Sequence, residues 1–369
     1  RCLMNNLPVR QAKNAILWKL KQLSFGRILR RAFRVFLDFD RFISMSYIFS
    51  RRSNAGEIEP NELSRVRARR HGFGLPIKDL SNTNPTKVGL DWKDHDLISL
   101  ATKDNVTYDP EPRGLYRARE AISDHFALYK RNMHPDNYFL CASTSEAYSW
   151  LFKLLCDPGD AVLVPKPGYP LFQHLAELDS VQVLAYRLEY AHPSGWYVNL
   201  DELSSVLAAD REKRIKAIVI INPNNPTGSY IRKTERTTII GLCEKYGLAL
   251  IADEVFFDFP IDDNIERKTF VGEDRVLTFV LDGLSKRMGL PQLKLAWITL
   301  SGPNQEVSRA KKRLDLIADT FLSVSTPIMN ALPFLFEHET AFLCKSLSRI
   351  RENYASYREI LTGGTSPHR

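Results

Sequence analysis

Short apolar runs alternate with amphipathic stretches along most of this 369-residue chain. Segments with apolar residues at helical spacing separate the runs, as in SEAYSWLFKLL (145–155). Runs of five or six apolar residues without alternation indicate parallel strands that are buried on both faces. The pattern therefore predicts an α/β domain over about residues 96–305. The predicted strands are YFLCA (138–142), AVLVP (161–165), VQVLAY (181–186), AIVIIN (217–222), LALIADEV (248–255) and VLTFVL (276–281).

Polar residues directly follow five of these strands. Ligands of open α/β sheets bind outside the carboxyl ends of the strands, so we expect these residues to line one site. They would bring hydroxyls, an aromatic ring, an amide, a carboxylate and an amine together. The residues are Ser143-Thr144, KPGYP (166–170), NPNNPTG (222–228), Asp253-Glu254 and DGLSK (282–286).

Three of these positions match the parts of one cofactor. Ser143 and Thr144 at a helix start offer free N–H groups to a phosphate, although a plain helix cap is the commoner role. Lys286 can form a Schiff base, although most lysines are simply solvated charges. Asp253 ends an apolar strand, where a carboxylate needs a cationic N–H partner such as a protonated pyridine nitrogen. Together they specify pyridoxal 5′-phosphate (PLP).

These residues also carry a family resemblance. The chain resembles the fold-type I, class I/II aminotransferases, which depend on PLP, over about residues 48–360. The matching motifs run in the family's order and spacing, and they are YDPEPRGLYRAREAI (108–122), STSEAY (143–148), PGYP (167–170), NPNNPTG (222–228), DEVF (253–256) and GLSKRMGLPQLKLA (283–296).

The resemblance implies a domain organisation. Residues 96–305 would form the three-layer α/β/α PLP-binding large domain, with a mainly parallel sheet. Residues 48–95 would form the N-terminal part of an α+β small domain. Residues 306–369 would form the interdomain helix and a truncated C-terminal part of the small domain.

The resemblance also implies a role for each matching residue. Lys286 would hold PLP and later carry the proton between the substrate Cα and the cofactor. Asp253 would keep the ring nitrogen protonated, and Asn225, on a loop that its prolines stiffen, would donate to the phenolic oxygen. The other cofactor contacts would come from Tyr169 on the ring, from Ser143, Thr144, Ser285 and Lys294 at the phosphate, and from Tyr108 across a homodimer interface.

Three positions in the cofactor motifs depart from the family pattern. Phe256 replaces a tyrosine whose hydroxyl usually also donates to the phenolic oxygen, so only Asn225 is expected to donate there. Lys294 replaces an arginine, which keeps the charge but loses the bidentate geometry. Gln292 replaces a small residue, and PLP should still bind.

The C-terminal part departs further. The family has there a strand-borne arginine, in an RxSF-like motif, that binds the substrate α-carboxylate. Here only TGGTSPHR follows the helical pattern that ends at position 361, and Arg369 lacks strand context. We therefore expect a C-terminally truncated family member whose transamination is impaired, since a bidentate carboxylate contact is lost.

The positive charge is concentrated at the N-terminus. The net charge is +8, but residues 1–53 hold 12 Lys and Arg against Asp38 and Asp40, which leaves −2 for the rest. The pI therefore indicates no nucleic-acid partner. Residues 1–47 are expected to be a basic amphipathic extension, with apolar residues at helical spacing in 14–43. The extension is either an arm without a role in the chemistry, a transit-type presequence or a weak membrane-surface contact.

The cysteines bear on the compartment. The chain has five, widely spaced and without a CxxC pair. This usage argues for reduced thiols in the cytoplasm, and against a zinc site or a disulfide framework. No metal site is expected.

The expected activity is transfer of an amino group from an amino acid to a 2-oxo acid. PLP-dependent carbon–sulfur lyases and aminocyclopropanecarboxylate synthases share the same motifs, so they remain alternatives. A non-catalytic or regulatory protein is a third, although about 45 N-terminal residues without a helix-turn-helix pattern argue against a DNA-binding domain. The sequence does not identify the amino donor or acceptor.

Overall fold

The computed structural model describes residues 50–53, 62–77, 84–90, 92 and 94–361. The chain separates into two units, Arg1–Glu57 and Ile58–Arg369. Every element below except the 3₁₀ helix η1 (Arg51–Ser53) belongs to the second unit. The expected amphipathic segment 14–43 and the C-terminal TGGTSPHR lie outside the described residues, and the domain boundaries stay predictions.

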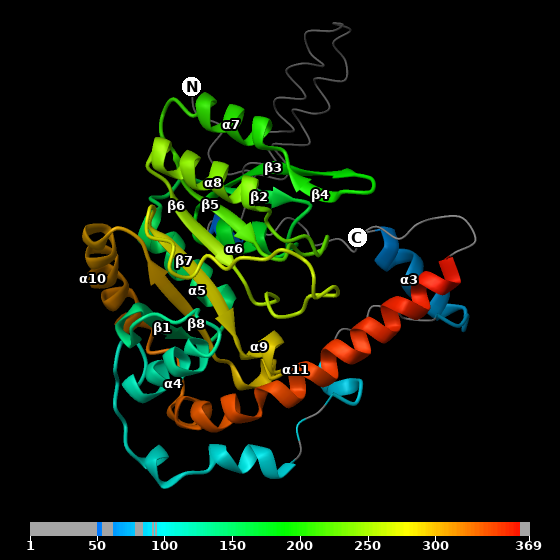
Figure 1. The fold of residues 1–369 in the computed structure, drawn as a ribbon, viewed down its shortest axis with the longest axis vertical. Helices are drawn as coiled ribbons and strands as arrows, with labels where there is room; N and C mark the ends of the chain where they lie inside the picture. Colours follow the sequence, from blue (N-terminus) through cyan, green and yellow to red (C-terminus); the bar gives the residue numbers. More distant parts are fainter. Residues whose placement is uncertain (1–49, 54–61, 78–83, 91, 93, 362–369) are drawn as a thin grey trace, which may run out of the picture. The chain divides into compact units, whose positions relative to one another are not determined.

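The described strands form one mixed sheet, in the order β1-β8-β7-β6-β5-β2-β3-β4 (Figure 1). Parallel pairing joins β7, β6, β5, β2 and β3, whereas β8 is antiparallel to both β7 and β1, and β4 is antiparallel to β3. The predicted mainly parallel α/β fold is confirmed. The strands are β1 (Tyr138–Cys141), β2 (Ala161–Lys166), β3 (Gln182–Ala191), β4 (Gly195–Val198), β5 (Ile215–Ile221), β6 (Ala249–Asp253), β7 (Thr278–Gly283) and β8 (Ala296–Ser301).

The pairing of β1 differs from the prediction. Residues 138–142 are expected to be a parallel strand, but β1 pairs antiparallel with β8, a strand that the apolar pattern misses. Because β8 is itself antiparallel to β7, β1 still runs in the same direction as the parallel strands. Its carboxyl end therefore lies at the same edge of the sheet as theirs.

Helices connect most of the strands. In the part of the chain that the structure describes, no helix is both long enough and apolar enough to cross a membrane. The α-helices are α3 (Glu62–Gly72), α4 (Tyr116–Ala127), α5 (Thr144–Leu155), α6 (Phe172–Leu178), α7 (Leu200–Ala209), α8 (Lys233–Tyr246), α9 (Leu284–Arg287), α10 (Asn304–Phe321) and α11 (Thr326–Leu361). The further 3₁₀ helices are η2 (Pro85–Lys87), η3 (Asp94–Leu100), η4 (Lys103–Val106), η5 (Pro135–Asn137) and η6 (Pro291–Leu293).

Helices cover both faces of the sheet (Figure 1). On one face, α5, α6 and α10 pack against strand residues such as Ile251 and Leu281. On the other face, α7 and α8 pack against residues such as Leu250 and Val280. Near β1 and β8, the core is completed by α4 and α11. Since side chains alternate along a strand, neighbouring strand residues point into different helix layers.

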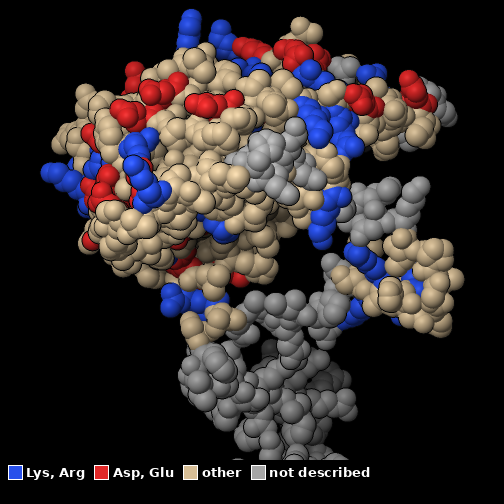
Figure 2. All heavy atoms as spheres, turned by 90° about the horizontal axis from the view of Figure 1, so that it is seen from below, with Lys and Arg blue, Asp and Glu red and all other residues tan. Residues whose placement is uncertain are grey.

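Basic and acidic side chains occur together on the face that Figure 2 shows. Cys141, Cys156, Cys243 and Cys344 are free thiols. Among the described residues, no three His, Cys, Asp or Glu side chains are grouped to bind a metal ion.

Candidate active site

The predicted site residues gather at one edge of the sheet. The carboxyl ends of β1, β2, β5, β6 and β7 lie there, and antiparallel β8 begins there. The backbones stay paired up to the edge, because the N–H of Asn222 donates to the carbonyl of Asp253 (2.8 Å) and the N–H of Glu254 donates to that of Leu281 (2.9 Å). The residues that follow these strand ends are therefore neighbours in space.

Asp253 is a buried carboxylate at the end of β6. Its side chain belongs to the face that α5 covers. The hydroxyl of Tyr148 donates to Oδ2 (3.0 Å), and the N–H of Val255 donates to Oδ1 (3.3 Å). Burial raises the pKa of Asp253 to about 6; these two hydrogen bonds and the charge of Lys286 lower it, while Asp282 adds to the rise. A protonated ring nitrogen would provide the cation that this carboxylate needs.

Lys286 lies in α9, directly after β7. Its side chain is exposed, and Nζ is 5.4 Å from the centre of the Phe256 ring. Gly283, at the end of β7, allows the chain that leads into α9 to pack closely against the start of β8. A Cβ at position 283 would lie 2.8 Å from the Cα of Ala296, so a larger residue would push α9 away from the sheet.

The asparagines of the NPNNPTG loop have different tasks. Asn222 is buried and donates through Nδ2 to Glu254 (3.2 Å), while Asn224 donates to the carbonyl of Pro167 (3.3 Å). Asn225 is half-buried and has no hydrogen-bond partner among the described residues. Two asparagines therefore hold the loop, and the third has its amide available to a ligand.

The expected phosphate contacts are less closely gathered. Ser143 is the N-cap of α5, where its hydroxyl accepts from the N–H of Glu146 (3.2 Å), so the structure gives it the plain capping role. Thr144 begins α5, and both Thr144 and Ser285 are half-buried. Lys294 is exposed and follows η6 in a left-handed conformation. In the described chain these groups make no hydrogen bond or ion pair with one another, but they border the same edge of the sheet.

The two expected tyrosines differ in their placement. Tyr169 is half-buried and packs against the core cluster that contains Tyr148, and burial together with the charge of Asp253 raises its pKa. Tyr108 is 73% exposed, and the described residues of this chain bring it into no contact with the site.

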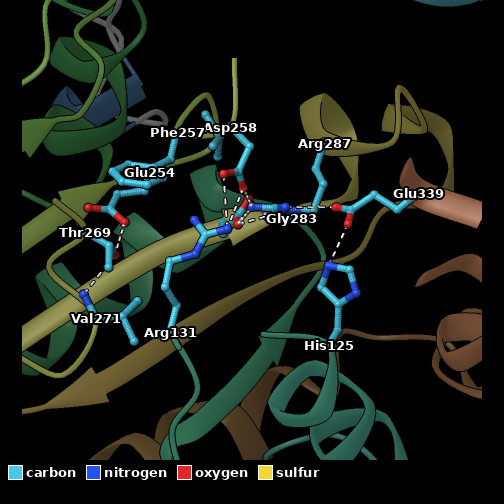
Figure 3. Close-up of polar contacts among 12 residues, drawn as sticks. His125, Arg131, Glu254, Phe257, Asp258, Thr269, Val271, Gly283, Arg287 and Glu339 are labelled. Carbon is cyan, nitrogen blue, oxygen red and sulfur yellow. Dashed lines mark hydrogen bonds and ion pairs between the residues drawn. The ribbon is translucent and has the colours of Figure 1, made fainter. Parts of the chain in front are cut away.

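A buried ion-pair cluster lies behind α9 (Figure 3). Arg287 donates to Asp282 (2.7 Å), Asp258 (2.6 Å) and Glu339 (2.9 Å). Burial opposes the charge of Arg287, but the three carboxylates raise its pKa. The cluster therefore links α9 to β7, to the loop after β6 and to α11.

Two further side chains extend the cluster. Arg131 donates to both oxygens of Asp258 (3.0 and 3.1 Å), and Nε2 of His125 lies 2.6 Å from Glu339. His125 also stacks on Phe336. Arg131 and His125 thus hold Asp258 and Glu339, which are two of the partners of Arg287 in α9.

Glu254 supports the site from the opposite face of β6. It accepts from Asn222, from the N–H of Phe270 (2.9 Å) and from the hydroxyl of Thr269. Burial raises its pKa to about 7, although these hydrogen bonds lower it. Sequence analysis misses the roles of Tyr148, Arg287 and Glu254, and only the alternation along β6 could have placed Glu254 opposite Asp253.

The residues at this edge fit PLP. A buried carboxylate with a raised pKa, an asparagine that has no hydrogen-bond partner in the described chain, a helix N-terminus and an amine border one site. These are the groups that a pyridine ring, a phenolic oxygen, a phosphate and an aldehyde require.

The comparison with known families decides the classification. The profile of the family "Aminotransferase class I and II" matches residues 80–366. The chain belongs to the class I and II aminotransferases. Members of this family depend on PLP, in agreement with the cofactor expected from the sequence.

Individual aminotransferases are similar to this chain. Glutamate-pyruvate aminotransferase of Escherichia coli (strain K12) is 28% identical over 264 residues, which cover 70% of this chain and 63% of that protein. Nicotianamine aminotransferase 1 of Oryza sativa subsp. japonica is 30% identical over 277 residues, covering 71% and 53%. The alanine aminotransferase structure from Pyrococcus furiosus superposes with a TM-score of 0.71 at 24% identity, covering 84% of this chain and 78% of that one, and it supports the fold. The chain spans less than two thirds of the length of these two sequence relatives.

Proposed function

We propose that this class I and II aminotransferase family member moves an amino group from an amino acid to a 2-oxo acid with PLP as its cofactor. The observation that carries the proposal is the placement of Asp253 and Lys286. They lie at the ends of adjacent parallel strands, and the charge of Lys286 acts on the buried Asp253. An amine and a carboxylate at one sheet edge fit the aldehyde and the ring nitrogen of PLP.

Each residue at the edge then has a task. When bound, PLP supplies an electron sink for the bond at the substrate Cα. Lys286 holds the cofactor and moves the proton at Cα, and Asp253 keeps the ring nitrogen protonated. Asn225 donates to the phenolic oxygen, and Tyr169 packs on the ring. The phosphate contacts come from Ser143, Thr144, Ser285 and Lys294.

The names of the relatives suggest the first substrates to test. The E. coli relative is called a glutamate-pyruvate aminotransferase, and the P. furiosus structure is an alanine aminotransferase. We therefore propose glutamate or alanine as amino donor and pyruvate or 2-oxoglutarate as acceptor.

A single-turnover experiment tests the reaction. The PLP-loaded chain is mixed with alanine or glutamate in the absence of a 2-oxo acid. Transfer predicts one equivalent of pyridoxamine phosphate and of 2-oxo acid per site, with no ammonia. A carbon–sulfur lyase needs a leaving group at Cβ, so it is tested in parallel with cysteine, from which a lyase would release pyruvate, ammonia and sulfide while PLP is regenerated. Lys286→Ala is the control, and it should give neither product at a comparable rate.

We also propose that the chain works as a homodimer in the cytoplasm. The 73% exposure of Tyr108 leaves this side chain available to a second copy, and the free thiols suit a reducing compartment. Light scattering of the purified chain tests the dimer. Tyr108→Phe should weaken PLP binding if the hydroxyl reaches the partner's phosphate, and a monomer would contradict the proposal.

A further inference from the structure

Tyr148 stands out among the buried tyrosines because its hydroxyl contacts the candidate site. The residue lies in α5 and is 1% exposed. Its ring packs edge-on against Phe172 and stacks with Phe152, so the ring itself belongs to the core. A phenylalanine would fill the same space. Only the hydroxyl, which donates to Oδ2 of Asp253 at 3.0 Å, requires a tyrosine here.

We propose that Tyr148 is a positioning residue for the cofactor's ring nitrogen, because its hydroxyl fixes the carboxylate of Asp253 and keeps it ionised. The inference rests on the proposed function, since it takes Asp253 as the partner of the pyridine ring. Tyr148 itself lies behind Asp253 and acts through it.

The groups around Asp253 act in opposite directions on its protonation, and the Tyr148 hydroxyl is one of them. Charged and titratable groups face Asp253 from several elements: Tyr148 from α5, Tyr169 from the loop after β2, Asp282 from β7 and Lys286 from α9. Burial and Asp282 favour the neutral acid, whereas the N–H of Val255 (3.3 Å), the hydroxyl of Tyr148 (3.0 Å) and the charge of Lys286 favour the carboxylate. Of the two hydrogen-bond donors, only the Tyr148 hydroxyl belongs to a side chain that a substitution can remove. Removal of the Tyr148 hydroxyl would therefore shift the balance toward the neutral acid.

Helix α5 also connects the two ends of the site. Ser143 caps its N-terminus, where the phosphate is expected, and Tyr148 follows five positions later. At 1.5 Å per residue this separation is roughly 7.5 Å along the helix axis. One rigid element therefore sets both the phosphate end and the ring-nitrogen end of the site.

The test measures PLP binding by the apoprotein as a function of pH, for wild type and Tyr148→Phe. Wild-type affinity should fall below about pH 6, where Asp253 becomes protonated. In Tyr148→Phe the fall should begin at a higher pH, and the affinity at neutral pH should be about tenfold weaker, as expected for a hydrogen bond to a charged group.

Tyr186→Phe is the matched control. Tyr186 is equally buried at 1% exposure, but its hydroxyl donates to the carbonyl of Val219, and its side chain packs on the opposite face of the sheet. This variant loses a buried tyrosine hydrogen bond of similar length (2.9 Å), to a neutral carbonyl, without touching Asp253. Its pH profile should superpose on that of wild type.

A second measurement needs no cofactor. Carbon-13 NMR titration of the apoprotein should give a higher pKa for Asp253 in Tyr148→Phe than in wild type. An unchanged Asp253 pKa, or binding profiles that superpose for wild type and Tyr148→Phe, would overturn the inference while leaving the proposed function intact. A wild-type chain that binds no PLP at any pH would overturn the proposed function and the inference with it.

Discussion

Asp253 and Glu254 are consecutive residues of one backbone, yet they support the candidate site from opposite faces of the sheet. Asp253 lies on the face of α5 and is bonded to Tyr148, while Glu254 lies on the other face and holds Asn222. Both carboxyls are buried, and burial raises the pKa of each, to about 6 and about 7. Asp253 is the proposed partner of the cofactor's ring nitrogen, and Glu254 holds the loop that carries Asn225.

Asp253→Asn should stabilise the apoprotein at alkaline pH. A folded-state pKa of about 6 lies above the unfolded value of 3.8, so the folded state binds more protons in this window. The cost of the buried charge therefore grows as the pH rises from about 4 to 6, and it is fully present above that. The free energy of unfolding of the variant should exceed that of wild type by about 3 kcal/mol at pH 8.

Denaturant unfolding of both apoproteins at pH 5 and pH 8 checks this prediction. The difference in unfolding free energy between Asp253→Asn and wild type should be smaller at pH 5 than at pH 8. The PLP affinity of the variant should be lost at both pH values. An equal difference in unfolding free energy at the two pH values would show that the charge of Asp253 carries no cost in the fold.

Glu254→Leu should loosen the NPNNPTG loop. The change leaves two buried donors, on Asn222 and Phe270, without their acceptor, at a cost of about 1–3 kcal/mol each, and it also removes the acceptor of the half-buried Thr269 hydroxyl. Unfolding free energy and PLP affinity should both fall. Glu254→Gln is the control, since it keeps an acceptor oxygen for Asn222 and should retain most of both. If the two variants bind PLP equally well, Glu254 does not support the loop.

Arg287→Met should strongly destabilise the protein at neutral pH. The variant would leave Asp258, Asp282 and Glu339 buried without their shared cation (Figure 3), which typically costs about 3–5 kcal/mol. The loss of stability should be smaller near pH 4, because the three carboxylates accept protons there. Thermal unfolding at the two pH values measures the difference.

Arg275→Met serves as the comparison for the ion-pair cluster. Arg275 pairs with Glu244 at the surface, with side-chain exposures of 48% and 40%, and such pairs contribute less than about 1 kcal/mol. If Arg287→Met lost as little stability as Arg275→Met, the buried cluster would contribute little to the placement of α9.

Phe256→Tyr should lower the pKa of the covalent link between Lys286 and PLP. The Phe256 ring centre lies 5.4 Å from Nζ of Lys286, so a hydroxyl added to this ring would reach toward the cofactor. A second donor to the phenolic oxygen weakens its hydrogen bond to the link's proton, with an expected fall of about one pKa unit. The pH dependence of the cofactor absorbance reports it. Phe259→Tyr, a change in the neighbouring ring, should leave the absorbance titration unchanged.

The sequence predicts the central strands well because they are buried on both faces. β5 and β6 contain almost no polar residues, so the apolar run and the strand coincide. β8 is missed because Thr299 and Ser301 interrupt its apolar pattern, although both are buried. An antiparallel strand between parallel ones has no signal of its own in the residue pattern.

The sequence predicts those candidate site residues that lie at or shortly after the end of a strand. Asp253, Asn225 and Lys286 have such positions, so they are located together by the family motifs and by the rule that ligands bind at the carboxyl ends of parallel strands. Tyr148 contacts Asp253 across 105 residues of sequence, and in the helical pattern it resembles any apolar core residue. Arg287 likewise meets Glu339, 52 residues away, only in the folded chain.

Borohydride reduction of the PLP-loaded chain, followed by peptide mass spectrometry, tests the central claim most directly. We predict a visible absorbance band that reduction abolishes, with one pyridoxyl group recovered on the peptide that contains Lys286. Lys286→Ala should lose both the band and the label. A label on another lysine, or no stable label on a wild-type chain saturated with PLP, would contradict the assignment of this sheet edge as the active site.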